Sequence, residues 1–315
     1  MEEVTPERQM KIEDVTALPT KHKFKGYSDL CSPAETTVEC LDVNQHLLVL
    51  GGWDGCVSTY SRKNNDYQFE DIQPIAEVPI KQIRLYERTV FIRDQQNRLS
   101  IYFFKHHELE PYKTFQVGND FVFVSKRVLD RHFGILTVRD GGLRVIDVKS
   151  EQEQTVLQSD LLKSNNVVVV NYRNKVLISS HRSLIIFDNA SRTIDKELPH
   201  CFHHDIEDIK PHNTRYLVSY SHRTVYYDEL KGDSVNHLFS LNLEMQISLL
   251  RVEAGAMLLI ADGHIVQLMA SKRVIRLSQG ELFEFGATDM KTSLDRLHIT
   301  GRDNEKQVRV FNLAI

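Results

Sequence analysis

The 315-residue sequence lacks the features that mark secreted and membrane proteins. Its amino-terminal stretch, MEEVTPERQ, is acidic and polar, whereas a secretory signal peptide begins with a basic and then an apolar segment. The longest apolar runs, such as Val167–Val170 and Ala256–Ala261, are far shorter than the roughly 20 residues that a membrane-spanning helix needs. We therefore expect no signal peptide, no membrane span and no membrane partner.

A surplus of charge of one sign is also lacking. The chain has 39 Lys and Arg against 43 Asp and Glu, which gives a net charge of -4. Such a balance creates no general field that would draw the protein to nucleic acid or to an anionic membrane. The composition therefore argues against nucleic acid as a partner.

The four cysteines, Cys31, Cys40, Cys56 and Cys201, show neither a paired spacing nor a CxxC motif. Disulfide frameworks and zinc sites use recognisable spacings, so we predict that all four thiols are free. Free thiols are typical of a reducing compartment, and we expect the protein to be intracellular, nuclear or cytoplasmic.

The sequence also lacks the motifs GxGxxG, HExxH and GxSxG and the P-loop. Its glycine-rich stretch Gly51–Gly55 lies between two predicted strands, so it predicts a hairpin turn rather than a phosphate loop. His200, His203 and Asp205, with Cys201 nearby, form the best local group for zinc. No second segment with ligand spacing accompanies this group, so we predict a solvated loop there, with no metal and no cofactor.

The chain is built from a repeat of a little over forty residues. Each repeat contains a strand of alternating apolar and polar residues that ends on an aromatic or aliphatic residue. These end residues recur every 40–44 positions: Tyr60, Tyr102, Ile146, Phe187, Tyr227, Leu268 and Phe311. In the first repeat, HLLVLGGWDGCVSTY predicts two strands joined by a turn at Trp53-Asp54-Gly55, because Gly allows the positive φ that such turns need. Another apolar strand precedes each such pair and a more polar one follows it, so each repeat holds four strands.

Seven repeats of four short strands predict an all-β fold, a seven-bladed β-propeller with four-stranded antiparallel blades. We assign residues 36–315 to the propeller and residues 1–35 to a polar lead-in. The seventh repeat has no outer strand of its own after Phe311, and an open edge would leave backbone groups unpaired. We therefore expect a segment between Val15 and Tyr27 to supply this strand and close the ring.

The repeat resembles that of the WD40 family over roughly residues 36–315. That family ends its third strand in Trp-Asp, where this chain has pairs such as Ile146-Asp147, and it has an Asp in the preceding turn, as at Asp54, Asp140 and Asp262. The Gly-His dipeptide of the family is missing from the blade starts, so we expect its hydrogen-bond network to be absent from most blades. The resemblance implies a WD-repeat scaffold or adaptor, a non-enzymatic subunit of a multiprotein complex.

The stretch LLVLGGWDGCVSTY is also similar to one blade of the mitotic-checkpoint and mRNA-export propeller proteins. In those proteins a Trp-Asp-Gly turn lies on a face that grips an acidic peptide. The similarity covers one blade and implies that Trp53 lies at a binding surface.

The turns between the second and third strands of the repeats are rich in arginine. In WD40-like propellers these turns share the top face, where partners dock, and Arg suits bidentate recognition of carboxylate or phosphate. We therefore predict that this face binds an acidic or phosphorylated segment of another protein subunit, although Arg and Asp neighbours could also pair with each other. The predicted contact residues are Trp53, Arg93, Arg98, Arg139, Arg182, Arg223 and Arg302.

Two other functions fit the same fold. One is a propeller enzyme with a metal ion or a small molecule in its axial channel, for which the predicted first strands offer Glu39, Asp42, Glu207 and Asp208 without clear symmetry. The other is a reader of histone tails or nucleic acid, although the lack of a basic surplus counts against nucleic acid. The docking hypothesis expects no small-molecule substrate, which separates it from the propeller enzyme.

Overall fold

A computed structural model describes residues 8–9, 13–14, 27–30, 37–63, 66–127, 132–164, 166–232, 234–253, 256–269, 274–276, 287–293, 296–301 and 308–312. In these ranges the elements are β-strands, apart from the short 3₁₀ helix η4 (Asp160–Lys163). The prediction of an all-β fold is thus confirmed for the described chain. None of the described segments is a helix with the length and apolarity that crossing a bilayer requires.

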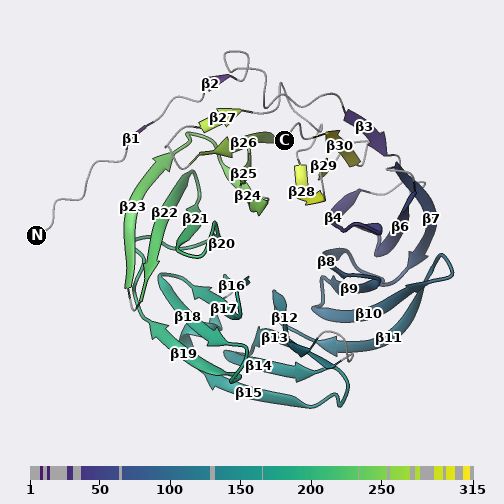
Figure 1. Cartoon of the computed structure of the whole chain (residues 1–315), viewed down its shortest axis with the longest axis horizontal. Coiled ribbons are helices and arrows are strands. Elements are labelled where there is room, and N and C mark those ends of the chain that lie inside the picture. The colour runs from purple at the N-terminus through teal and green to yellow at the C-terminus, as the bar shows by residue number, and fades with distance from the viewer. Residues whose placement is uncertain are drawn as a thin grey trace, which may run out of the picture. The chain divides into compact units, whose positions relative to one another are not determined.

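The described strands form seven sheets, in which the strands of one repeat lie side by side in chain order (Figure 1). Five sheets have four strands: β4 (Val38–Val43), β5 (Leu47–Gly52), β6 (Cys56–Lys63) and β7 (Asp66–Pro74); β8 (Ile80–Tyr86), β9 (Thr89–Asp94), β10 (Arg98–Lys105) and β11 (Glu108–Gln116); β12 (Phe121–Arg127), β13 (His132–Arg139), β14 (Gly142–Asp147) and β15 (Glu153–Gln158); β16 (Val167–Tyr172), β17 (Lys175–Ser180), β18 (Ser183–Asp188) and β19 (Thr193–Leu198); and β28 (Ala287–Ser293), β29 (Arg296–Gly301), β30 (Val308–Asn312) and β3 (Tyr27–Leu30).

The other two sheets contain a fifth, two-residue strand from the amino-terminal region. They are β20 (Asp208–Pro211), β21 (Tyr216–Ser221), β22 (Thr224–Lys231) and β23 (Ser234–Asn242) with β1 (Arg8–Gln9), and β24 (Ile247–Glu253), β25 (Ala256–Ala261), β26 (His264–Leu268) and β27 (Val274–Arg276) with β2 (Glu13–Asp14). The added strands β1 and β2 run parallel to β23 and β27.

The chain forms two compact units. Unit 1 comprises residues 1–11 and 117–257, and unit 2 comprises residues 12–116 and 258–315. Unit 1 contains the sheets β12–β15, β16–β19 and β20–β23, whereas unit 2 contains β4–β7, β8–β11 and the sheet of β28–β30 with β3. The boundary at residue 257 falls within β25.

Apolar runs in the inner strands explain why the sheets stack. Every residue of β5 is buried, whereas β19, a fourth strand, alternates between exposed and half-buried residues. In unit 2, Val49 and Val57 pack with Ile83 and Ile92 of the next sheet in one core. Strands buried on both faces read as continuous apolar runs, and burying each such side chain contributes about 1.5–3 kcal/mol. The fourth strands are polar because only one face is covered.

The outer strand of the last repeat comes from the amino-terminal region. β3 pairs antiparallel with β30, with Tyr27 opposite Phe311 and Leu30 opposite Val308. The sequence places this strand between Val15 and Tyr27 and pairs it with the strand that holds Val308 and Phe311. The described strand begins at Tyr27 and has that partner. Residues 15–26 lie outside the described part of the chain. A short strand of four residues within a polar lead-in has no strong apolar pattern from which to read its bounds.

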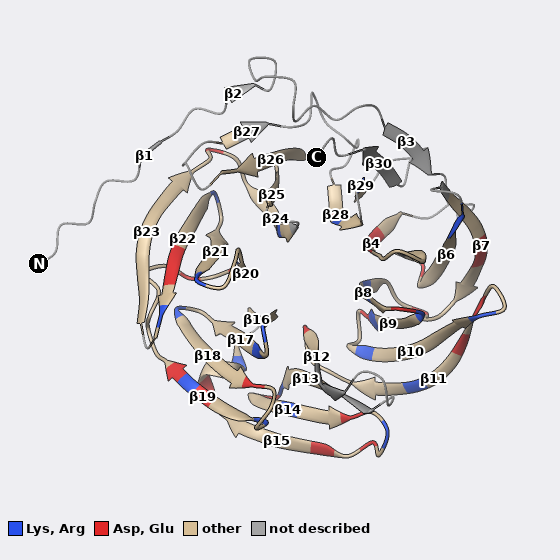
Figure 2. Ribbon diagram, viewed as in Figure 1, with Lys and Arg blue, Asp and Glu red and all other residues tan. Residues whose placement is uncertain are grey.

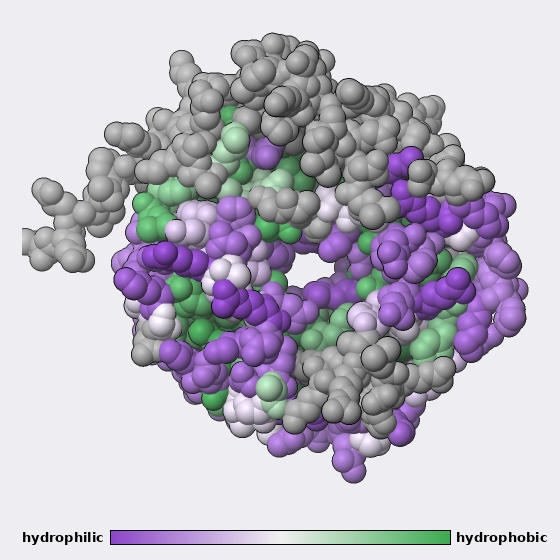
Figure 3. Space-filling view, in the orientation of Figure 1, coloured by the Kyte–Doolittle hydropathy of each residue, from purple (hydrophilic) through white to green (hydrophobic). Residues whose placement is uncertain are grey.

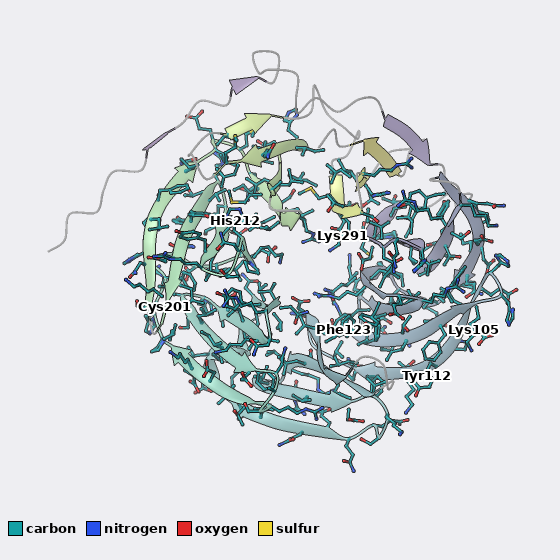
Figure 4. The ribbon with its side chains drawn as sticks, viewed as in Figure 1. Lys105, Tyr112, Phe123, Cys201, His212 and Lys291 are labelled. Carbon is teal, nitrogen blue, oxygen red and sulfur yellow. The ribbon has the colours of Figure 1, made fainter. Side chains whose placement is uncertain are left out.

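The described cysteines Cys40, Cys56 and Cys201 are free thiols, and Cys31 lies outside the described residues. Cys40 is buried, and its burial raises the pKa of the thiol well above the usual range. Burial and the hydrogen bond with Asp54 raise the pKa of Cys56 to about 11, and burial raises that of Cys201 (Figure 4) to about 12. Because thiolate is the reactive form, these thiols should react slowly in the native protein.

We therefore expect four free thiols per chain when the protein is titrated under denaturing, non-reducing conditions. In the native state at pH 7, Cys56 and Cys201 should react at least about tenfold more slowly than an unperturbed thiol, since their raised pKa values lower the thiolate fraction by more than one decade. Cys40 should also react slowly, because burial raises the pKa of its thiol. A denatured count of two or zero would show that the cysteines are paired.

Candidate functional site

The turns between the second and third strands of a sheet, which we call b–c turns, are where the sequence predicts partner contacts. The described ones are tight turns at residues 53–55, 95–97, 140–141, 181–182, 222–223 and 262–263. Because adjacent strands are antiparallel, the b–c turn of each sheet lies at the end opposite to its other two hairpin turns. Arg302 lies outside the described residues.

The first b–c turn shows how the local sequence sets its geometry. Gly55 has a φ of +80°, and a Cβ there would lie 2.0 Å from the carbonyl oxygen of Ala76. Only glycine tolerates both conditions. Asp54 Oδ1 accepts a hydrogen bond from the backbone N–H of Cys56 at 3.0 Å, which holds the turn closed. The side chain of Trp53 is thereby left at the tip.

Trp53 is the most exposed of the large hydrophobic residues in the described chain, with 52% of its surface accessible. The Nζ of Lys81 lies 4.9 Å from the centroid of its ring, and the same Nζ is 3.4 Å from Glu39 Oε2. An ammonium group over an indole face is a favourable cation–π arrangement. Lys81, from the first strand of the next sheet, thus lies beside the predicted contact residue Trp53.

The two arginines of the β9–β10 turn make contacts within their own sheet. Arg93 donates from Nε to Gln82 Oε1 at 3.1 Å and from Nη1 to Asn97 Oδ1 at 2.8 Å. Arg98 donates from Nε to Asp94 Oδ2 at 2.7 Å. Asp94 is almost fully buried, so this pair stabilises the turn itself. Both arginines hold the b–c turn in shape, which makes them weaker candidates for partner contact.

Arg139 in unit 1 is also engaged by a carboxylate of its own sheet. Its Nη2 donates to both carboxylate oxygens of Glu153, at 2.9 and 3.2 Å, and Arg144 donates to the same carboxylate. The Nε of Arg139 is 3.5 Å from Asp140 Oδ2. The possibility that Arg and Asp neighbours pair with each other is therefore realised in this turn.

Among the arginines of the described b–c turns of unit 1, Arg182 and Arg223 are more accessible than Arg139. Half of the Arg182 side chain is exposed, and its Nε lies 3.3 Å from Asp205 Oδ1, which is itself exposed. Such a surface pair contributes roughly 0–1 kcal/mol and can exchange its partner. Arg223 is exposed and forms no ion pair with the described residues. Acidic and basic residues alternate over the sheets rather than forming one block (Figure 2).

A buried polar network lies inside the sheet β20–β23. His204 Nε2 and Ser219 Oγ are 2.9 Å apart, and the His204 ring stacks on Tyr226 with centroids 3.4 Å apart. Burial lowers the pKa of His204 to about 3, so the imidazole is neutral at pH 7. The sequence contains a signal for this network, namely a histidine before the first strand and a serine in the second strand. The network was not predicted, because the Gly-His dipeptide of the family is missing there.

Two residues of the local group that was considered for zinc binding, His203 and Asp205, make other contacts. The His203 ring lies 6.3 Å from the ring of His237, and Asp205 pairs with Arg182. In the described residues, no group of three His, Cys, Asp or Glu side chains is arranged to hold a metal ion.

The carboxylates of the predicted first strands have structural partners. Asp42 accepts hydrogen bonds from its neighbour Val43 at 2.9 Å and from Leu85 of the next sheet at 2.7 Å. Glu39 pairs with Lys81, Glu207 with His222, and Asp208 with Lys210. Lys291, labelled on β28 in Figure 4, is the strongest of the charges that act on Asp42. Each of these carboxylates is thus engaged by a group of the protein itself, and those of Glu39 and Asp42 join two sheets.

Comparison with solved structures identifies the fold. The chain is similar to the β-propeller domain of Cps50 (Swd1) from Myceliophteria thermophila, with a TM-score of 0.69, 9% sequence identity, and coverage of 93% of this chain and 99% of that one. No protein-family model matches the sequence, and no curated protein matches it significantly. At this identity the likeness concerns the fold alone. The protein is an all-β β-propeller with four-stranded antiparallel blades.

Proposed function

We propose that this propeller is a non-enzymatic docking subunit of WD-repeat type in an intracellular multiprotein complex. Its b–c turns would bind an acidic or phosphorylated segment of a partner protein. The observation that carries this proposal is Trp53, whose exposed indole lies at a rigid turn with the Lys81 ammonium over its ring. Tryptophan is among the residue types that most often anchor interfaces.

The surface and the fold support the same proposal. On the face seen in Figure 3, hydrophilic residues cover much of the described surface, with hydrophobic areas between them, which suits a partner segment that carries charge. The first-strand carboxylates that an enzyme with an axial metal would need are engaged in structural contacts. We further propose that each of the seven sheets is one blade and that β3 completes the last of them, which closes the ring.

Replacing Trp53 by alanine is expected to weaken partner binding by about 2 kcal/mol, which is roughly 30-fold in Kd, because the anchor of the interface is lost. The double variant Arg182→Glu, Arg223→Glu is expected to weaken binding by about a hundredfold through two reversed charges. The measurement is the affinity of each purified variant for the partner recovered with the tagged protein. Stability should be unchanged, because all three side chains are exposed.

The matched control is Arg173→Glu, since Arg173 is also exposed but lies in the turn between β16 and β17, at the opposite end of the sheet that carries Arg182. It should leave binding unchanged, and an equal loss would indicate general electrostatics rather than a site. Wild-type affinity in the Trp53→Ala variant would place the partner on another surface.

A further inference from the structure

Unit 2 contains a pocket of about 250 Å³ at the ends of the strands opposite to the b–c turns. It lies between the sheets β4–β7 and β8–β11, which are joined there by a hydrogen bond from Asn44 Nδ2 to the carbonyl oxygen of Glu87 at 2.7 Å. The lining residues are His46, Leu47, Ser61, Arg62, Lys63, Arg88, Phe104, His106 and His107. Drug-sized ligands occupy pockets of roughly 300–1,000 Å³, so this one suits a smaller group.

The lining is strongly basic, although the whole chain is acidic. Its charged side chains are Arg62, Lys63 and Arg88, and three imidazoles add further N–H donors. The nearby carboxylate, Glu70, is almost fully buried and is engaged by Lys63 at 3.6 Å and by the Ser61 hydroxyl. Arg62 lines the pocket but its Nη1 is buried, whereas Arg88 is exposed, so Arg88 presents the accessible guanidinium group.

The basic side chains are held on rigid strand ends. The backbone N–H of Arg62 donates to the carbonyl oxygen of His46 at 2.9 Å, and that of Phe104 donates to the carbonyl oxygen of Arg88 at 2.8 Å. Each bond joins a strand end to the neighbouring hairpin turn of its own sheet. Preorganised donors lose less conformational entropy on binding than donors in a mobile loop.

The turn between β10 and β11 carries the most unusual backbone of this region. His106 and His107 have φ values of +49° and +74°, a pair of left-handed residues for which Asn-Gly is the favoured sequence. Among the described residues, no other two adjacent non-glycine residues share this conformation. His107 Nδ1 lies 2.6 Å from Glu70 Oε2, which orients its ring, and Lys105 precedes the turn at the end of β10 (Figure 4). The strained turn keeps two imidazoles at the pocket.

We infer that this pocket binds a phosphoryl group. Arginine guanidinium groups recognise phosphate oxygens bidentately, and the Lys63 ammonium and the imidazole N–H groups supply further donors for a tetrahedral dianion. The site is independent of the b–c turns, because it lies at the other end of the strands and uses none of the same residues. The phosphoryl group could be carried by a small free phosphate or by a phosphorylated side chain of a partner, since both present the same chemistry.

Isothermal titration calorimetry of the full chain with sodium pyrophosphate, at about 0.15 M salt, tests the inference. The wild-type protein is expected to bind, Arg88→Gln to bind about tenfold more weakly, and Arg62→Gln, Arg88→Gln about a hundredfold more weakly. Arg88 is exposed, so its single variant should fold normally even if the double variant does not. The matched control Arg173→Gln removes an exposed arginine that lies in neither the pocket nor a b–c turn and should bind as wild type does.

A second titration, with a phosphoserine peptide and the same peptide carrying serine, identifies the carrier. Tighter binding of the phosphopeptide than of pyrophosphate, with loss in Arg88→Gln, indicates a phosphorylated partner, whereas binding of pyrophosphate alone indicates a small free phosphate. The inference is overturned if neither probe binds the wild-type chain, or if Arg88→Gln binds both as tightly as wild type. Equal weakening by the control would also overturn it, because bulk charge would then explain the binding.

Discussion

Lowering the pH from 7 to 5 is expected to reduce the free energy of unfolding by about 4 kcal/mol, through two buried histidines. His204 in unit 1 and His298 in unit 2 are both buried, His298 completely. Burial lowers the pKa of His204 to about 3 and that of His298 to about 4. Burial disfavours the charged form because an imidazolium in an apolar environment loses its hydration.

The sign of this change in the free energy of unfolding follows from how many protons the folded and the unfolded states bind. In the folded protein both imidazoles stay neutral down to about pH 4, whereas in the unfolded chain they take up a proton near pH 6.5. Between these values the unfolded state binds more protons, so stability is fully present above pH 6.5 and is lost as the pH falls toward 4. At pH 5 each histidine costs about 2 kcal/mol, a large share of a typical stability of 5–15 kcal/mol.

Urea denaturation at pH 7 and pH 5 measures this loss, and two variants identify its source. His298→Leu should remove its share, so that the loss between the two pH values shrinks by about 2 kcal/mol. His200→Gln, at an exposed histidine in the same chain, should leave the loss unchanged. An unchanged loss in His298→Leu would show that other groups cause the acid sensitivity.

The sequence predicted the strands well because their signals are local. The alternation of apolar residues and the Asp and Gly of the turns are read within a window of a few residues. The repeat predicts that the third strands end on apolar residues such as Tyr60, Phe187 and Tyr227, and all three are buried in the structure. The b–c turns followed from the same pattern, because a turn lies where two strands of one repeat meet.

The contacts of the candidate site could not be predicted in the same way, because they join residues far apart in the sequence. Glu153 binds Arg139 from the next strand but one, and Lys81 reaches Trp53 from another sheet. A list of arginines in turns carries no information on which of them already has a carboxylate partner. The basic pocket was missed for the same reason, since His46 and His107 meet only after two sheets pack together.

Removing the amino-terminal strand β3 is expected to destabilise the protein by roughly 2–6 kcal/mol, since about four backbone hydrogen bonds of 0.5–1.5 kcal/mol each are lost. All four residues of β3 pair with β30, from Tyr27 opposite Phe311 to Leu30 opposite Val308. Without them β30 becomes an exposed edge strand, which also favours association with other chains.

Two truncations that differ by four residues isolate this effect. A chain of residues 27–315 loses β1 and β2, each of which pairs through only two residues, but keeps β3. A chain of residues 31–315 loses β3 as well. We expect the first to unfold within about 1 kcal/mol of the full chain in urea, and the second to show most of the loss and to aggregate at lower temperature. Equal stability of the two truncations would mean that the β3–β30 pairing contributes nothing measurable, and the last blade would then be stable with three strands.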